Sequence, residues 1–94
     1  MTTAARILKK ETIAQLMNDK NVKSQGYKIL ARWALNQPTS LLKLEQKGFL
    51  VLYTTLVNQQ EEEMEALLTN RDASMSEQEL LELQGINTSL LISD

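Results

Sequence analysis

The chain has 94 residues, of which 43% are apolar and only 4% aromatic, and it contains no cysteine and no histidine. This length fits one small domain, and the missing residue types exclude a disulfide framework, a thiolate zinc site, an imidazole general base and a Ser-His-Asp triad. No apolar run has the length of a signal peptide or of a bilayer-spanning helix, so we expect a soluble cytoplasmic protein.

The formal net charge is −2, but the charges are unevenly distributed along the chain. Residues 1–50 carry nine basic and three acidic side chains, whereas residues 51–94 carry one basic and nine acidic side chains, so the halves have net charges of +6 and −8. Such asymmetry can mark a half that faces nucleic acid. It can equally mark two halves that attract each other, within one chain or across a dimer. Both interpretations stay open at this point.

Two helices are predicted in the N-terminal half. Residues 3–19 consist mostly of strong helix formers and have a weak apolar face. Residues 24–36 predict a second helix, with Ser24 in the position of an N-cap. This helix should end before Pro38, because the residue that precedes a proline disfavours the helical conformation.

The segment LLKLEQKGFLVLYTTLV, residues 41–57, admits two interpretations. If Gly48 ends a helix, FLVLYTTLV becomes a strand, but no second strand-like run exists to pair with it. If the helix continues through Gly48, one apolar stripe keeps its phase along the whole segment and beyond it. The members of this stripe are Leu42, Phe49, Tyr53, Leu56, Met64 and Leu67. The continuous phase favours a helix over residues 40–69 that can kink at Gly48.

A helix over residues 40–69 would be a rod of roughly 45 Å. That is long for a domain whose radius of gyration should be about 13 Å. Either the helix bends at Gly48, or part of its apolar stripe packs against another chain. The second option suggests a helical homodimer.

A short fourth helix is predicted over residues 76–84. Ser76 and Glu79 match a capping box, and Gly85 stands where a C′ glycine would end the helix. The sequence as a whole therefore predicts a single all-α domain over residues 1–94, built as a small bundle of about four helices with a long third helix.

Two segments resemble DNA-binding motifs. TIAQLM, a polar turn and then SQGYKILARW, residues 12–33, look like a loose helix-turn-helix, although the connector is longer than a tight turn. LLKLEQKGFLVL, residues 41–52, resembles the place in winged-helix proteins where the recognition helix runs into the wing. The resemblances imply a DNA-binding regulator that uses the basic N-terminal half, although each nominates a different recognition helix. The implied phosphate or base contacts are Lys23, Gln25, Lys28, Arg32, Lys43 and Lys47.

The glutamate run at residues 61–65 is the one place where a cation could be shared, because Glu61 and Glu65 lie one helical turn apart. Metal sites in helical bundles usually add histidines or an ExxH pair, which this chain lacks. The run is therefore interpreted as a solvated helix face. No nucleophile motif and no phosphate-binding glycine loop is present, so we predict no enzyme activity, no cofactor, no metal and no small-molecule substrate.

The favoured interpretation is a small non-enzymatic interaction or regulatory protein, and the DNA-binding regulator is the alternative. Amphipathic helices and an apolar end without site chemistry are typical of the first class. The expected partner is a second copy or a helix of another protein, and not a membrane. The apolar tail either docks on its own core or contacts another chain. The candidate contact residues are Phe49, Tyr53, Leu56, Leu90, Leu91 and Ile92.

Overall fold

The computed structural model describes residues 2–69, 76–88 and 90, and within this part of the chain all regular structure is helical. The predicted all-α class is thus confirmed. The helices are α1 (Thr2–Ala5), α2 (Lys10–Met17), α3 (Ser24–Asn36), α4 (Pro38–Gln46), α5 (Phe49–Thr69) and α6 (Glu77–Leu83). The molecule measures 38 × 29 × 21 Å and has a radius of gyration of 13.2 Å. Over these residues, six helical segments therefore stand where about four helices were predicted for the chain.

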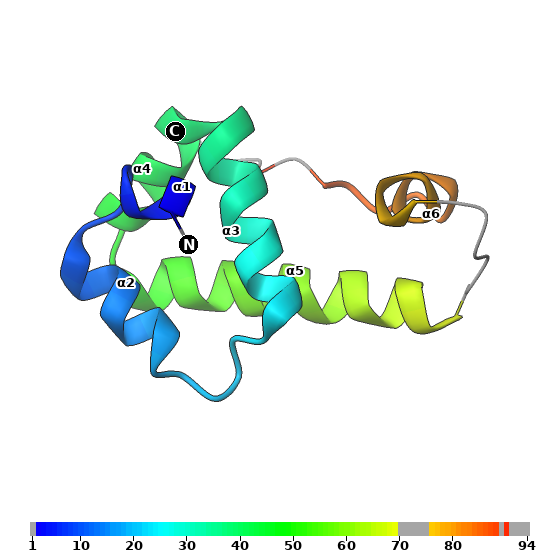
Figure 1. The fold of residues 1–94 in the computed structure, drawn as a ribbon, viewed down its shortest axis with the longest axis horizontal. Helices are drawn as coiled ribbons and strands as arrows, with labels where there is room; N and C mark the ends of the chain where they lie inside the picture. Colours follow the sequence, from blue (N-terminus) through cyan, green and yellow to red (C-terminus); the bar gives the residue numbers. More distant parts are fainter. Residues whose placement is uncertain (1, 70–75, 89, 91–94) are drawn as a thin grey trace.

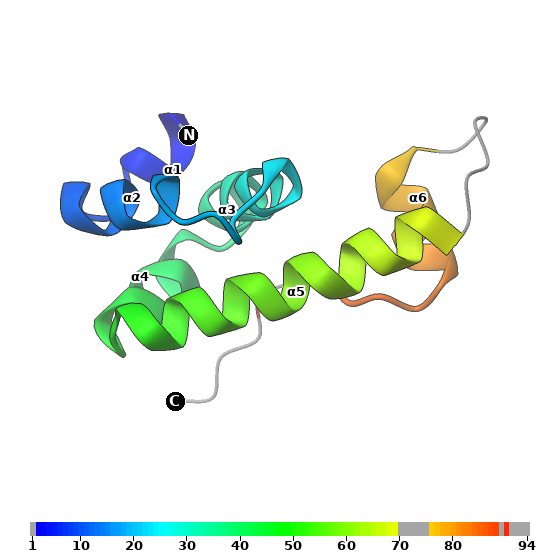
Figure 2. The ribbon, with the colours of Figure 1, turned by 90° about the horizontal axis from the view of Figure 1, so that it is seen from below.

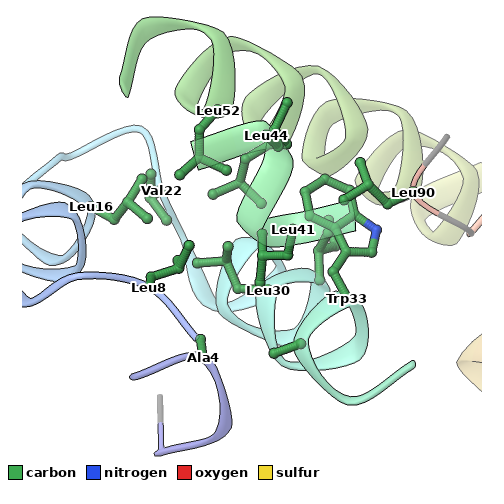
Figure 3. Packing of buried hydrophobic residues seen from close by; sticks show 13 residues of the cluster. Ala4, Leu8, Leu16, Val22, Leu30, Trp33, Leu41, Leu44, Leu52 and Leu90 are labelled. Atoms are coloured by element: carbon green, nitrogen blue, oxygen red, sulfur yellow. The ribbon is translucent and has the colours of Figure 1, made fainter. Parts of the chain in front are cut away.

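Helix α3 is the centre of the fold and packs on α1, α4 and α5 (Figures 1 and 2). It occupies the same residues as the predicted second helix, and Ile29, Leu30 and Trp33 on it are almost completely buried. Figure 3 shows how side chains from both halves of the chain surround this helix. The other members of the core are Ala4, Leu8, Leu16, Val22, Ala34, Leu41, Leu44, Leu52, Leu56 and Leu90. Each fully buried leucine contributes about 1.5–3 kcal/mol through removal of its surface from water.

The predicted helix over residues 3–19 is divided into α1 and α2. The N–H groups of Ile7 and Leu8 both bond to the Ala4 carbonyl, and the backbone of Lys9 is extended, with φ −67° and ψ 154°. This turn allows both Ala4 and Leu8 to reach the core. The Lys9 N–H donates to Glu45 Oε2 on α4 at 2.8 Å, so the interruption of the helix does not leave this donor unpaired.

The predicted continuous helix over residues 40–69 is also divided, at Gly48. The φ angle of Gly48 is +118°, a region that L side chains rarely adopt. Its N–H donates to the Glu45 carbonyl at 3.0 Å, and its own carbonyl accepts from the Leu52 N–H at 3.2 Å. Gly48 therefore ends α4 and begins α5, so neither a wing strand nor an uninterrupted rod describes this segment.

The break at Gly48 changes which side chains face the core. Leu41 and Leu44 are buried, whereas Leu42, which the predicted stripe placed on the inner face, is exposed. The phase of the stripe is therefore not shared by α4 and α5. A change of helix direction removes any need for such a shared phase, because each helix packs its own face.

Helix α5 has 21 residues and is about 31 Å long. Its N-terminal part lies against α4 and its middle crosses α3, while its last turns extend past α3 and have α6 beside them (Figures 1 and 2). We call residues 61–69 together with α6 the arm. Ala66, Leu80 and Leu81 are the buried apolar residues of the arm.

Helix α6 begins and ends as its local sequence predicts. The Ser76 hydroxyl accepts from the Glu79 N–H at 3.2 Å. At the other end Gly85 has φ +75°, its N–H bonds to the Glu82 carbonyl, and the Ile86 N–H bonds to the Leu81 carbonyl. These two bonds form a Schellman motif, which satisfies carbonyls that a helix end would otherwise expose.

Candidate functional site

A buried carboxylate joins α3 to α5. Glu63 on α5 is 0% exposed, and the Arg32 guanidinium donates to both of its oxygens, from Nη1 to Oε2 at 2.8 Å and from Nη2 to Oε1 at 2.7 Å. Gln25 Nε2 donates to Oε1 at 3.0 Å, and Gln59 Nε2 donates to Oε2 at 2.7 Å. The buried charge is therefore paired and fully hydrogen-bonded, which is the condition under which such a pair is tolerated.

The titration of Glu63 follows from this arrangement. Burial alone would raise the pKa of its carboxyl by penalising the charged form. The hydrogen bonds from Arg32, Gln59 and Gln25, together with the charge of Arg32, outweigh burial and hold the pKa below its ordinary value. A general base needs an accessible oxygen and a pKa near the working pH, so this carboxylate is suited to holding helices together.

The segment that follows α6 returns to the main core, where side chains of the core form hydrogen bonds with its backbone groups. Arg32 Nη1 donates to the Thr88 carbonyl at 3.2 Å. The Gln37 side chain pairs with both backbone groups of Leu90, donating to its carbonyl at 2.8 Å and accepting from its N–H at 2.7 Å. Leu90 is thereby placed beside the Trp33 indole, where it is buried (Figure 3).

Gln60 on α5 fixes the connection between α2 and α3. Its Oε1 accepts from the Lys23 N–H at 2.8 Å, and its Nε2 donates to the Asn21 carbonyl at 2.7 Å. Gly26, in the first turn of α3, comes so close that an added Cβ would stand 2.5 Å from Gln60 Oε1. This close approach lets the connection lie directly on α5 and form a fixed wall beside it.

A groove of about 400 Å³ opens next to this wall, and no residue of α6 lines it. Val57, Met64 and Leu68 supply its apolar surface, and they recur at i, i+7 and i+11 on one face of α5. Leu68 is 61% exposed. The remaining residues that line the groove are Asn21, Lys23, Gln60, Glu61 and Glu65. The groove thus combines an apolar surface with two exposed carboxylates and one exposed lysine.

The residues that the DNA-binding resemblances implied as nucleic-acid contacts do not lie together on one surface. Gln25 and Arg32 bind the buried Glu63 and are directed away from any nucleic acid while that network holds. Lys28 pairs with Glu77 on α6, with a distance of 2.8 Å between Nζ and Oε1. Lys23, Lys43 and Lys47 are exposed, on the α2–α3 connection and around the end of α4. A recognition helix must present its side chains to solvent, whereas α3 is the most enclosed helix of the core.

The predicted partner-contact residues also lie in different environments. Leu56 and Leu90 are buried in the core of the chain. Phe49 and Tyr53 are half-buried and stack with their ring centroids 5.9 Å apart. The Tyr53 hydroxyl donates to Asp19 Oδ1 at 3.1 Å, so its polar end holds the α2–α3 connection. Leu91 and Ile92 lie outside the described residues.

Sequence reasoning missed Leu68 as an exposed residue of the groove and Glu63 as a buried charge. The apolar stripe was centred on Phe49 and Tyr53, whereas the buried side of α5 is centred on Leu52, Leu56, Gln60 and Glu63. A usable signal was present, because Leu50, Val57 and Met64 repeat at intervals of seven residues. No pattern in the sequence marked one glutamate of the run as different from its neighbours.

No model of a known protein family matches this chain, and neither the curated proteins nor the solved structures contain a significant match to it. Within the described part of the chain, no helix combines the length and the apolar character needed to cross a membrane. Over the same residues, no three acidic side chains are gathered in a way that could hold a metal ion. The groove and the distribution of charge around it are therefore the features of this chain that bear on its function.

Proposed function

We propose that this chain is a non-enzymatic helical interaction protein that receives a helix of a protein partner in the groove along α5. The observation that carries the proposal is the apolar face of Val57, Met64 and Leu68, which α6 does not line and which ends at the wall formed by the α2–α3 connection. A helix laid into such a groove buries apolar residues at the same i, i+3, i+4 and i+7 spacing.

The apolar face in the arm is accessible to a partner helix. The last turns of α5 extend past α3 (Figure 2), whereas Gln60 and Glu63 before them are still buried against it. Leu68 in these turns is 61% exposed and lines the groove. A partner helix would remove this surface from water at about 25 cal/mol for each Å² that it covers.

Site-specific photo-crosslinking tests the proposal in the cells that make the protein. A photoreactive residue is placed at Leu68 in the groove and, as a control, at Leu83 on α6, which is 65% exposed and does not line the groove. We expect discrete protein adducts from position 68 that are absent from position 83. These adducts should disappear when Met64→Lys places a charge on the groove surface. No discrete adduct from position 68, or equal adducts from both positions, would contradict the proposal.

A further inference from the structure

The end of the molecule opposite the arm carries a surface that complements the groove. On α2, Lys10, Ala14 and Met17 are exposed and follow the i, i+4, i+7 spacing of one helix face. Met17 is 58% exposed. Lys20 is exposed just beyond the end of the helix, and neither it nor Lys10 forms an ion pair within the described chain. Helix α2 thus presents an apolar centre between two positive charges.

The groove presents the opposite arrangement. Its apolar surface of Val57, Met64 and Leu68 is accompanied by the carboxylates of Glu61 and Glu65. Lys23 is the one basic side chain that lines the groove, so its carboxylates outnumber its basic groups by two to one. A basic helix with one long, flexible apolar side chain fits such a groove, and Met17 supplies that type of side chain.

We propose that the groove receives α2 of a second copy of this chain, so that two chains form an antiparallel dimer in which each copy contributes its α2 and its groove. This inference rests on the proposed function and names the partner. In one chain α2 leads directly into the connection that walls the groove. A two-fold axis beside this connection can therefore make both contacts at once, as an isologous interface requires.

Charge decides between this dimer and one in which α5 packs on α5. An α5–α5 contact through the groove would place Glu61 and Glu65 of both copies together, and like charges across an interface suppress association. The α2–groove contact instead joins the two halves of the chain that carry net charges of +6 and −8. Stable interfaces bury roughly 1,600 Å² of surface in total. Because the dimer contains two α2–groove contacts, each contact needs to bury only about half of that area.

Sedimentation equilibrium of the full chain is the first measurement. At about 100 µM protein in 0.1 M NaCl, we expect a weight-average mass near that of two chains. In 1 M NaCl, where the Debye length falls from about 10 Å to about 3 Å, we expect the dissociation constant to rise at least about tenfold. A chain that stays monomeric at this protein concentration in 0.1 M NaCl would overturn the dimer.

Charge reversal tests the pairing of surfaces. The variants Glu61→Lys/Glu65→Lys and Lys10→Glu/Lys20→Glu each place like charges across both contacts, so each should be monomeric alone. An equimolar mixture restores opposite charges at both contacts and should form a heterodimer. The pair Glu79→Lys/Glu82→Lys makes the same charge change on α6 and should leave the dimer intact. Failure of the mixture to associate, with both variants folded by circular dichroism, would overturn the proposed pairing.

If a charge-reversal variant fails to fold, the single variants Met17→Glu and Leu68→Lys take its place, and their mixture is again expected to associate. A monomer in solution that still crosslinks from position 68 to a different protein would overturn the dimer and leave the proposed function standing. A chain that is monomeric in solution and forms no protein adduct from position 68 would reject both proposals. If Lys10→Glu/Lys20→Glu abolished binding to a DNA duplex and left the dimer unchanged, α2 would be assigned to nucleic acid and the proposed pairing would be overturned.

Discussion

Arg32 on α3 donates from both terminal nitrogens to the two carboxylate oxygens of Glu63 on α5, and Glu63 has no surface exposed to solvent. This pair takes one charge from each half of a chain whose halves have opposite net charge. The charge asymmetry of the sequence is thus used, in part, to join the central helix to the longest one. Lys28 and Glu77 make a second and exposed connection of the same kind between α3 and α6.

The two partners of the buried pair should differ in their effect on stability. Arg32→Met leaves the buried Glu63 carboxylate without its cation, and breaking a buried pair in this way costs about 3–5 kcal/mol. Glu63→Gln leaves Arg32 partly exposed and still able to donate, so we expect a smaller cost of about 1–3 kcal/mol. Urea unfolding at pH 7, followed by circular dichroism, measures both variants. Lys28→Met, which removes an exposed pair, is the control and should cost at most about 1 kcal/mol.

Glu63 should also contribute a pH-dependent part of the stability. Because the pKa of Glu63 is lower in the folded chain than the unfolded value of about 4.3, its stabilisation is complete above that value and is lost as pH falls through the folded pKa. Urea titrations at neutral pH and at steps below pH 4 should show the free energy of unfolding falling less steeply in Glu63→Gln than in the parent chain. Equal slopes would mean that the pKa of Glu63 is not lowered by folding.

Gly26→Ala should destabilise the chain, although alanine is the better helix former by about 1 kcal/mol. The added Cβ would stand 2.5 Å from Gln60 Oε1 and 3.1 Å from Val22 Cγ1. Moving the Gln60 amide breaks its two bonds to the α2–α3 connection, so we expect a net loss of about 1–2 kcal/mol. In a Gln60→Ala background the same substitution should be close to neutral. Additive effects of the two substitutions in thermal unfolding would contradict the close contact.

Gly48→Ala distinguishes the bent arrangement from a continuous helix. At φ +118° an alanine is strained, and we expect a loss of about 1–2 kcal/mol. In an uninterrupted helix the same change would instead stabilise the chain by about 1 kcal/mol. The sign of the change in melting temperature therefore decides between the two arrangements. Gln46→Ala, two residues earlier on the exposed side of α4, is the control and should have almost no effect.

Much of the secondary structure followed from local signals. Pro38 separates α3 from α4, while Ser76 and Gly85 bound α6, because caps and proline act within a few residues of the backbone. The absence of a second strand-like run correctly excluded a strand at residues 49–57. Local helix propensity also predicted α3 over its full range.

The divided helices and the groove depend on contacts between residues far apart in the chain. The interruption at Lys9 is compensated by Glu45, 36 residues away, and the burial of Glu63 depends on Arg32, 31 residues earlier. Helical periodicity describes one helix at a time, so it assigned Leu42, which is exposed, to the inner face.

By itself, the sequence determined that the chain is helical, that its charge is divided between its halves, and where capped helices begin and end. These properties depend on composition and on near neighbours. The tertiary structure decided which charges are buried, which glycine bends the chain and which side of α5 stays open. Those outcomes depend on which faces of the separate helices pack together in one small core. The side of α5 that stays uncovered is the surface that the proposed dimer uses.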